Sequence, residues 1–328
     1  MNETLTSKER RSDVDIAKAI CIVLVVVGHY FPDGAPVWYS TFRDWIYSFH
    51  MPLFMFLSGF LYALSGKGKS YAAFLWKKVK RLLLPYVLVS VLIILIKMLG
   101  QNVMNLDLKN PIGPASFYRI LLGPEAAVHL WFILALWWMF VVVRLSDGLE
   151  WHIALLAVGL ALHYLPHFIP SLTYPHVFCL NYAAGFFVYF MLGAVISDLG
   201  WSFSSCRTVC PLAFVMLFAV NSLTGFAAGV SEYIGIAGMA GLAYFISRLP
   251  AGAVRPFAVV SEASYAIYLL HSVFIGFTVT AVRMTCPALL DADGRLFWAG
   301  ALLITVISTV SCVLVKICLK KFTGILLR

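Results

Sequence analysis

Residues 45–60 read WIYSFHMPLFMFLSGF, and this stretch decides the fold class. It is apolar almost throughout, although His50 and Pro52 lie within it. With its continuation to residue 64 it is long enough to cross a bilayer, because a spanning helix needs about 20 mostly apolar residues. Ionisable groups inside spans are costly and mark functional sites by default. The stretch therefore predicts a transmembrane helix with a polar site.

The composition extends this prediction to the whole chain of 328 residues. Hydrophobic residues make up 62% of it and charged residues only 12%, with a mean hydropathy of +0.90, whereas a soluble domain averages about 25% charged residues. We predict an all-α, polytopic membrane protein: a single domain, residues 1–328, formed by a bundle of about ten transmembrane helices. The candidate spans are 14–31, 45–64, 82–100, 128–145, 150–166, 178–197, 209–225, 230–248, 262–281 and 297–318.

The distribution of Lys and Arg predicts the topology. With both termini in the cytoplasm, 18 of the 24 basic residues fall on the inner side or near it, as expected for short cytoplasmic loops. Topology then accounts for the net charge of +9, and no nucleic-acid partner is expected. The partner expected from composition is membrane lipid.

Polar groups in the first span come at helical spacing. Lys18 and His29 are eleven residues apart, close to three turns, so they share a face about 16 Å apart along the axis. Asp15 lies three residues before Lys18 and can pair with it. The alternative is a lysine that extends to the inner surface and a histidine at the outer interface.

The second span brings another imidazole to the same level. It runs inward from the outside, so His50 enters near the place where His29 leaves. Imidazole is the usual general base near neutral pH, and the loop between the two spans adds Asp33 and Asp44. These groups predict a proton-handling site. Alternatively, His50 caps a helix start before Pro52, a residue suited to a first turn.

A basic run precedes the third span. Residues 71–86 read YAAFLWKKVKRLLLPY, with Lys77, Lys78, Lys80 and Arg81 on the predicted cytoplasmic side. One interpretation is an anchor to anionic lipid and a topology signal. The other is a clamp for the phosphates of a cytoplasmic anionic cofactor.

Two further spans carry histidines. In the ninth, Ser264, Tyr268 and His271 share a face, and His271 falls near mid-membrane, so it is expected to face the bundle interior. It is either a catalytic residue or a packed structural one. In the fourth span, His129 lies at the outer end among tryptophans, where aromatic belts form, and it is either interfacial or lines the site. No metal site is indicated, because the histidines and cysteines lack metal-ligand spacing.

Several stretches together resemble the membrane-bound acyltransferase family 3, and more narrowly its fucose 4-O-acetylase-like branch. They cover nearly the whole chain in order: DIAKAICIVLVVVGHY (15–30), SFHMPLFMFLSGFLY (48–62), KKVKRLLLPY (77–86), HLWFILALWW (129–138), FFVYFMLGAVI (186–196) and SEASYAIYLLH (261–271). The first three, with their spacing, are the more specific. The resemblance implies a bundle of about ten helices that moves an acyl group, usually acetyl from acetyl-CoA, to a sugar hydroxyl.

The resemblance also assigns roles. The essential histidine of the family follows a glycine at the end of the first span, here His29. Eleven residues before it the family usually has arginine, and this chain has Lys18, which keeps the charge but loses the planar fork. Lys18, Lys80 and Arg81 would then hold the phosphates of acetyl-CoA, and His50 or a nearby carboxylate would orient or relay the proton. A covalent acetyl-histidine is an open alternative.

The expected function is therefore a membrane O-acyltransferase of a bacterial inner (cell) membrane. Its partners would be acyl-CoA and a surface glycan or lipid-linked sugar acceptor, and no metal is expected. Two other classes stay open. A transporter of a lipid-linked sugar or small anion should show repeats or paired broken helices, which the sequence lacks. A non-catalytic scaffold leaves the shared face of Lys18 and His29 unexplained.

Overall fold

The computed structural model describes residues 12–32, 34–65, 70–100, 112–124, 127–206, 210–224, 230–291 and 296–322. Within these ranges the regular structure is helical and contains no strand. The termini, Asp33 and the basic residues at 67 and 69 lie outside the described residues. The prediction of an all-α membrane protein is confirmed.

The long helices follow the predicted spans closely. Their bounds are α1 Ser12–His29, α2 Val37–Leu64, α4 Leu84–Gly100, α6 Trp131–Val143, α7 Leu149–Phe168, α8 Leu180–Asp198, α9 Cys210–Thr224, α10 Ser231–Ser247, α11 Ala251–Thr285 and α12 Phe297–Phe322. Shorter helical pieces are α3 Tyr71–Lys78, η1 Val79–Leu83, α5 Ala115–Arg119, η2 Val128–Leu130, η3 Val177–Cys179, η4 Phe203–Cys206 and η5 Pro287–Leu289.

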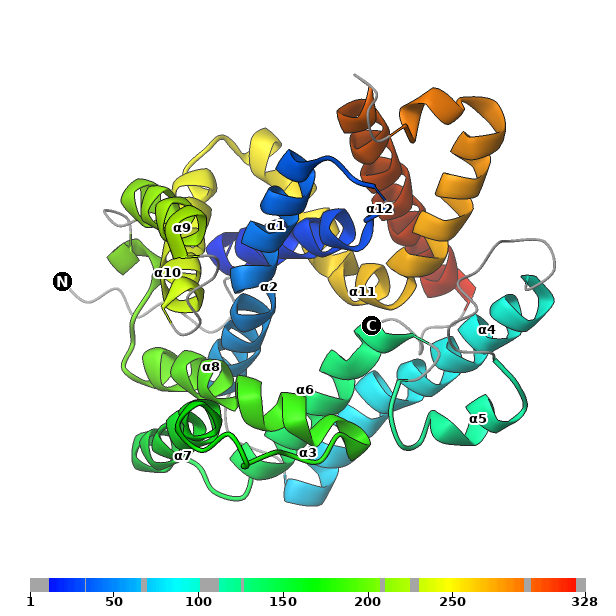
Figure 1. Cartoon of the computed structure of the whole chain (residues 1–328). Helices are drawn as coiled ribbons and strands as arrows, with labels where there is room; N and C mark the ends of the chain where they lie inside the picture. The colour runs from blue at the N-terminus through cyan, green and yellow to red at the C-terminus, as the bar shows by residue number, and fades with distance from the viewer. Residues whose placement is uncertain are drawn as a thin grey trace.

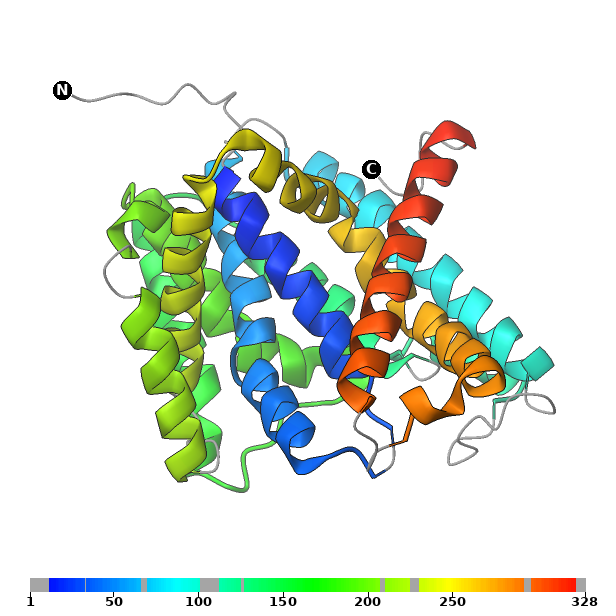
Figure 2. The ribbon, with the colours of Figure 1, turned by 90° about the horizontal axis from the view of Figure 1, so that it is seen from above.

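Six segments are long and apolar enough to cross a membrane by length and composition. They are Val37–Leu64, Tyr71–Gly100, Leu149–Phe168, Val177–Asp198, Ala251–Thr285 and Phe297–Leu319, and Val128–Val143 is a shorter apolar helix. Figure 2 shows that the first described turn of α1 and the last turn of α12 lie at the same end of the bundle. This arrangement agrees with termini on one side of the membrane, while the count of ten spans stays a prediction.

Two apolar cores meet at α1. Residues from its first half, including Val14 and Cys21, pack with α2, α6, α8 and α10. Residues from its second half, including Ile22 and Val26, pack with α4, α11 and α12. In Figure 1 the first group, with α7 and α9, occupies one side of the molecule and the second group the other. The half of α1 that ends in His29 therefore packs in the second core, with α4, α11 and α12.

Close helix packing in the first core depends on two glycines. A Cβ atom added to Gly59 on α2 would collide with the backbone of Phe190, and one added to Gly193 on α8 would collide with that of Phe56. Small residues allow such close approach between membrane helices, where van der Waals packing provides much of the association energy. This contact fixes α2, and with it His50, against α8.

Residues 71–81, which the sequence predicted only as a basic run before the third span, are helical. The hydroxyl of Ser70 accepts a hydrogen bond from the amide of Ala73 and caps α3, and the chain then passes through the five-residue π-helical turn η1 into α4. The prediction missed this helix because four cations interrupt the apolar pattern. The extension also changes the site, because it places Lys80 and Arg81 on a π-helical turn.

Candidate active site

His29 is the last residue of α1 and lies in a cluster of three imidazoles. Its ring centroid is 4.7 Å from that of His271 on α11 and 5.8 Å from that of His129 on η2. The centroids of His129 and His271 are 4.7 Å apart. We call these three residues the histidine cluster. His29 and His271 are 242 positions apart in the sequence, and His129 lies 142 positions before His271. Only the tertiary fold therefore brings the three rings together.

Backbone carbonyls fix which nitrogen carries the proton. Nδ1 of His29 is 2.8 Å from the carbonyl oxygen of Val25, and Nδ1 of His271 lies 2.9 Å from that of Tyr268. A carbonyl only accepts, so each Nδ1 must donate, and a neutral ring then has its lone pair on Nε2. His29 and His271 are thus held in the tautomer whose Nε2 can accept a proton.

Two nitrogens of the cluster are buried without a protein partner. Among the described residues, Nε2 of His129 and Nε2 of His271 have no hydrogen-bond partner, and the His271 side chain is fully buried. Buried polar atoms are normally paired, so an unpaired one requires an explanation. A substrate hydroxyl or carbonyl that enters the cluster would supply the missing contacts.

His50 joins the cluster through Tyr47. The Tyr47 ring centroid is 4.8 Å from that of His50 and 6.2 Å from that of His29. His50 is 2% exposed, and its Nδ1 donates to the carbonyl of Ile46 at 2.8 Å. The two imidazoles of the first two helices are therefore neighbours, but the rings closest to His29 in this cluster come from η2 and α11.

His129 is positioned by a contact that the sequence did not suggest. The hydroxyl of Tyr268 donates to the backbone carbonyl of His129 and thereby attaches η2 to α11. The sequence left His129 as either interfacial or lining the site, and the structure places it in the cluster. A single histidine among tryptophans gives no signal for this placement, since the partner residues lie on distant segments.

Arg43 is a further residue that sequence reasoning did not select. Its Nε donates to the carbonyl of Gly28 at 2.9 Å, and its guanidinium lies 4.3 Å from the centroid of the Tyr47 ring and 4.4 Å from that of Phe31. This cation satisfies one of the last carbonyls of α1, a favourable position for positive charge. Arg43 therefore holds the end of α1 beside His29.

The helix α11 connects the cluster to the opposite, basic end of the bundle. Ser261 donates to Oδ1 of Asp15 at 2.5 Å, and Tyr265, one turn later, donates to the carbonyl of Leu82 at 3.0 Å. The first contact lies one turn from Lys18 on α1, and the second lies on the turn that carries Lys80 and Arg81. From Ser261 to His271 the helix rises about 15 Å.

The cations of the basic run face different surroundings. Lys80 and Arg81 are exposed, and Lys80 lies 5.2 Å from the Trp76 ring. The ammonium group of Lys78 lies only 3.5 Å from the centroid of the Phe140 ring, and this contact joins the end of α3 to α6. Exposed Lys80 and Arg81 are accessible to an anionic ligand. π-Helical turns occur frequently at functional sites.

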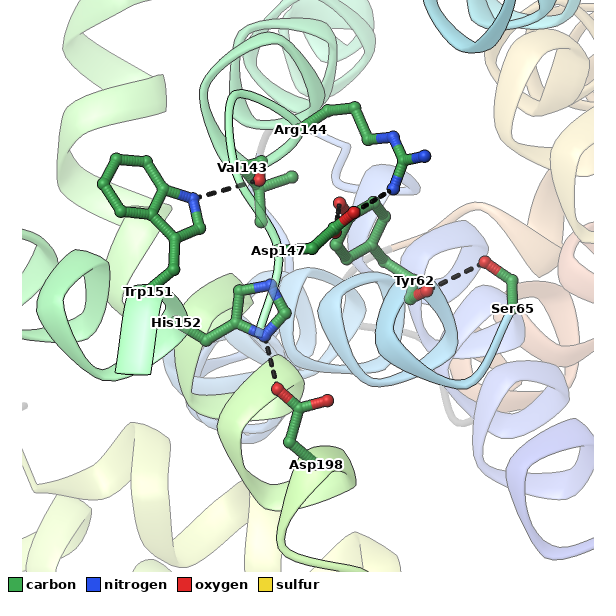
Figure 3. A network of polar contacts seen from close by, with 8 residues as sticks. All are labelled: Tyr62, Ser65, Val143, Arg144, Asp147, Trp151, His152 and Asp198. Carbon is green, nitrogen blue, oxygen red and sulfur yellow. Dashed lines mark hydrogen bonds and ion pairs between the residues drawn. The ribbon is translucent and has the colours of Figure 1, made fainter. Parts of the chain in front are cut away.

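A separate polar network joins the ends of α2, α6, α7 and α8 (Figure 3). Nδ1 of His152 is 2.5 Å from Oδ2 of Asp198, and Arg144 contacts Asp147 at 2.7 Å. The hydroxyl of Tyr62 donates to Asp147 at 3.3 Å. No functional role was predicted for His152. The structure gives it one in packing, because its ring, 2% exposed, attaches α7 to α8.

Metal-ligand geometry is not found in the described part of the chain. No group of three or more His, Cys, Asp or Glu side chains there could hold a metal ion. The three rings of the histidine cluster pack edge to face. The arrangement suits proton transfer: nitrogens with fixed tautomers, enclosed in an apolar bundle, with a helix leading to a basic surface.

The comparisons with known proteins agree with this geometry. The profile of a family described as an acyltransferase domain matches residues 11–317. The chain belongs to this family. It is also similar to the nodulation protein NolL of Mesorhizobium japonicum, with 28% identity over 196 residues, which cover 54% of this chain and 48% of NolL. The chain thus spans about half the length of this curated relative. No solved structure matches it.

This acyltransferase-family member is a multi-pass membrane protein, as its apolar helices indicate. The resemblance to acyltransferases is confirmed, whereas the fucose 4-O-acetylase-like branch stays a prediction. The catalytic role of His29 and His50, the cofactor-binding role of Lys18, Lys80 and Arg81 and the site-lining role of the residues Asp15, His129, Tyr268 and His271 are also predictions.

Proposed function

We propose that the protein is a membrane O-acyltransferase that moves an acetyl or other short acyl group from cytoplasmic acyl-CoA to a sugar hydroxyl on the outer side. The observation that carries this proposal is the position of His29. It lies in a histidine cluster with a fixed tautomer, and α11, which carries His271, contacts the basic turn about two to three helical turns away. A donor and an acceptor from opposite sides could meet there.

The donor would bind at the basic end. Lys18, Lys80 and Arg81 would hold the phosphates of acyl-CoA, with Lys18 one turn from the Asp15–Ser261 contact and Arg81 next to the carbonyl that Tyr265 holds. The thin pantetheine arm would follow α11 toward the cluster. Charge-assisted hydrogen bonds to phosphate are the stronger kind, which favours two or more cations at this place.

One imidazole, that of His29, would carry the proton from the acceptor hydroxyl to the CoA thiolate. Nε2 of His29 would take the proton of the acceptor hydroxyl, and the oxygen would attack the thioester carbonyl. The C–S bond of the tetrahedral intermediate would then break, and the imidazolium would return its proton to the CoA thiolate. The hydrogen bond from Nδ1 to the carbonyl of Val25 keeps Nε2 as the nitrogen that takes up and then returns the proton. His271 and His129 would orient the hydroxyl, and His50, through Tyr47, would keep the ring in place.

The test is the variant His29→Ala in purified, membrane-reconstituted protein supplied with acetyl-CoA and saccharide acceptors. General base catalysis typically contributes about 10²- to 10⁴-fold, so acceptor-dependent release of CoA should fall at least about a hundredfold. The control is His167→Ala, an exposed histidine at the end of α7, which should behave like the wild type. Full transfer by His29→Ala, with both variants equally folded, would refute the assignment.

A further inference from the structure

An open pocket of about 600 Å³ lies beside the histidine cluster. Ligand pockets in proteins typically measure about 300–1,000 Å³. Its walls come from the segment 118–124, from η2 with the start of α6, and from residues 176–182 around η3. The side chains that matter below are Tyr118, Arg119, Trp131, His176, Asn181 and Tyr182.

One 3-10 turn separates this pocket from the cluster. Residues three apart in such a turn point the same way, and Val128 and Trp131 both line the pocket. His129, between them in sequence, instead meets His29 and His271. The same turn therefore presents one face to the pocket and another to the histidine cluster, and a ligand in the pocket lies next to His129 but not on it.

The lining of the pocket combines aromatic faces with polar groups at its edge. Trp131 and Tyr182 are stacked, with centroids 4.3 Å apart and planes at 25°. Arg119, His176 and Asn181 supply donors and acceptors. A pyranose ring has the matching surfaces, since its C–H face packs on an aromatic ring while its hydroxyls form hydrogen bonds around the edge.

The pocket is held open by an unusual backbone. Phe178 and Cys179 are two consecutive non-glycine residues with φ of 56° and 58°, a conformation that costs energy and is retained where the surroundings enforce it. The amide of Phe178 donates to the carbonyl of Leu122 at 2.6 Å, and Trp138 donates to the carbonyl of Phe178 at 3.2 Å. These bonds join the two walls, so the pocket is formed before a ligand binds.

We infer that this pocket binds a glycosyl unit of the acceptor that is adjacent to the unit being acylated. The inference rests on the proposed function, which supplies the reacting hydroxyl at His29. Because the pocket and the cluster occupy different faces of one turn, a single sugar does not fill both. An acceptor of two or more units places one in the pocket and the next at His29, so the enzyme selects oligosaccharides or glycan chains.

The test compares acceptor length. Transfer from acetyl-CoA is measured with a panel of methyl hexosides and methyl deoxyhexosides and with their di- and trisaccharides. The KM of the wild-type enzyme for the acceptor should be lower for a disaccharide than for the corresponding monosaccharide. Tyr118→Ala and the isosteric Asn181→Asp should raise the KM of the longer acceptors about two- to tenfold, as expected for the loss of about one hydrogen bond or contact, and should thus remove the advantage of length.

The control is Trp298→Ala. Trp298 on α12 is 59% exposed, as is Tyr118, but lies outside the pocket, so this variant should keep the wild-type dependence on length. The KM for acetyl-CoA and the thermal stability of each variant show whether a change is specific. If both pocket variants keep the wild-type KM for the longer acceptors, the inference is wrong.

A second measurement separates this inference from the proposed function. Quenching of tryptophan fluorescence by the same saccharides reports binding without transfer. If the protein binds di- and trisaccharides, if Asn181→Asp weakens this binding, and if no acyl group is transferred, the pocket assignment is supported. The same result refutes the proposed function. If transfer occurs with a KM independent of length, the proposed function stands and the pocket assignment falls.

Discussion

Gly28 precedes His29 at the end of α1, where a side chain would have to displace the ring of Tyr47. A Cβ atom at this position would lie 2.7 Å from Cε2 of Tyr47. Tyr47 in turn contacts the rings of His29 and His50 and the guanidinium of Arg43. The glycine thus permits the close approach of α2 to α1 that surrounds the proposed base with aromatic and cationic groups.

The variant Gly28→Ala should therefore lose both stability and activity. Displacement of Tyr47 should lower the free energy of unfolding by about 1–3 kcal/mol, as overpacking typically does. The rate of acyl transfer should fall as well, because the ring beside His29 moves. Thermal unfolding in detergent and the rate of CoA release measure the two effects. Gly185→Ala on α8 is the control, because its added Cβ meets no atom within 4 Å and alanine favours a helix. An unchanged melting temperature for Gly28→Ala would contradict the packing argument.

Single residues also show where the sequence was informative. The spacing of Lys18 and His29 on one helical face was readable, because α1 is one unbroken helix. The role of Arg43 could not be read from the sequence, since it depends on the carbonyl of Gly28 and the rings of Phe31 and Tyr47. The sequence placed Arg43 in an outer loop before residue 45, whereas it lies on α2. A cation predicted in a loop has many possible partners, and composition does not choose among them.

Among the helices, α11 has the widest set of polar contacts at the candidate site. Along about ten residues it meets Asp15 through Ser261, the π-helical turn through Tyr265, and the carbonyl of His129 through Tyr268, before it presents His271. A rigid helix is a suitable element for this purpose, because it fixes the separation between the basic end and the cluster.

Tyr265→Phe tests the contact between α11 and the π-helical turn. Loss of its hydrogen bond to the Leu82 carbonyl should cost about 1 kcal/mol and loosen the turn that carries Lys80 and Arg81. The KM for acetyl-CoA should rise about fivefold, while the KM for the acceptor changes little. Steady-state kinetics with each substrate varied in turn measures the difference.

The matched control for this variant is Tyr174→Phe. Tyr174 also donates to a helix carbonyl, that of Leu162 at 2.8 Å, but it belongs to the connection between α7 and α8. The Tyr174→Phe variant should lose a similar amount of unfolding free energy as Tyr265→Phe, and its KM for acetyl-CoA should stay at the wild-type value. Equal effects of the two variants on that KM would show that Tyr265 has no specific connection with the donor.

At the scale of the whole molecule, the proposal requires that the two ends of the bundle face different aqueous phases. The last turn of α12 lies at the end where α1 begins (Figure 2). Cys318 is exposed near that end of α12, and Cys286 is exposed directly after α11. In the predicted topology Cys286 lies toward the outer side and Cys318 toward the cytoplasmic side, so the two thiols test that topology.

We expect a membrane-impermeant maleimide to modify Cys286 in intact cells and to reach Cys318 only after the cells are permeabilised. Mass spectrometry of the labelled peptides measures both sites. Cys286→Ser and Cys318→Ser each remove one signal and confirm its assignment. Modification of Cys318 from outside intact cells would reverse the predicted topology and would place the basic turn on the wrong side for a cytoplasmic donor.

The sequence by itself determined the class of the molecule, the helical segments and the presence of polar groups within them. Hydrophobic length and the spacing along one helix are local properties, so residues near in sequence reveal them. The tertiary structure alone decided that His29, His129 and His271 form one cluster and that Val128 and Trp131 line a pocket next to it. Such contacts join helices distant in sequence, and the packing of close-fitting side chains and glycines, rather than any local pattern, selects them.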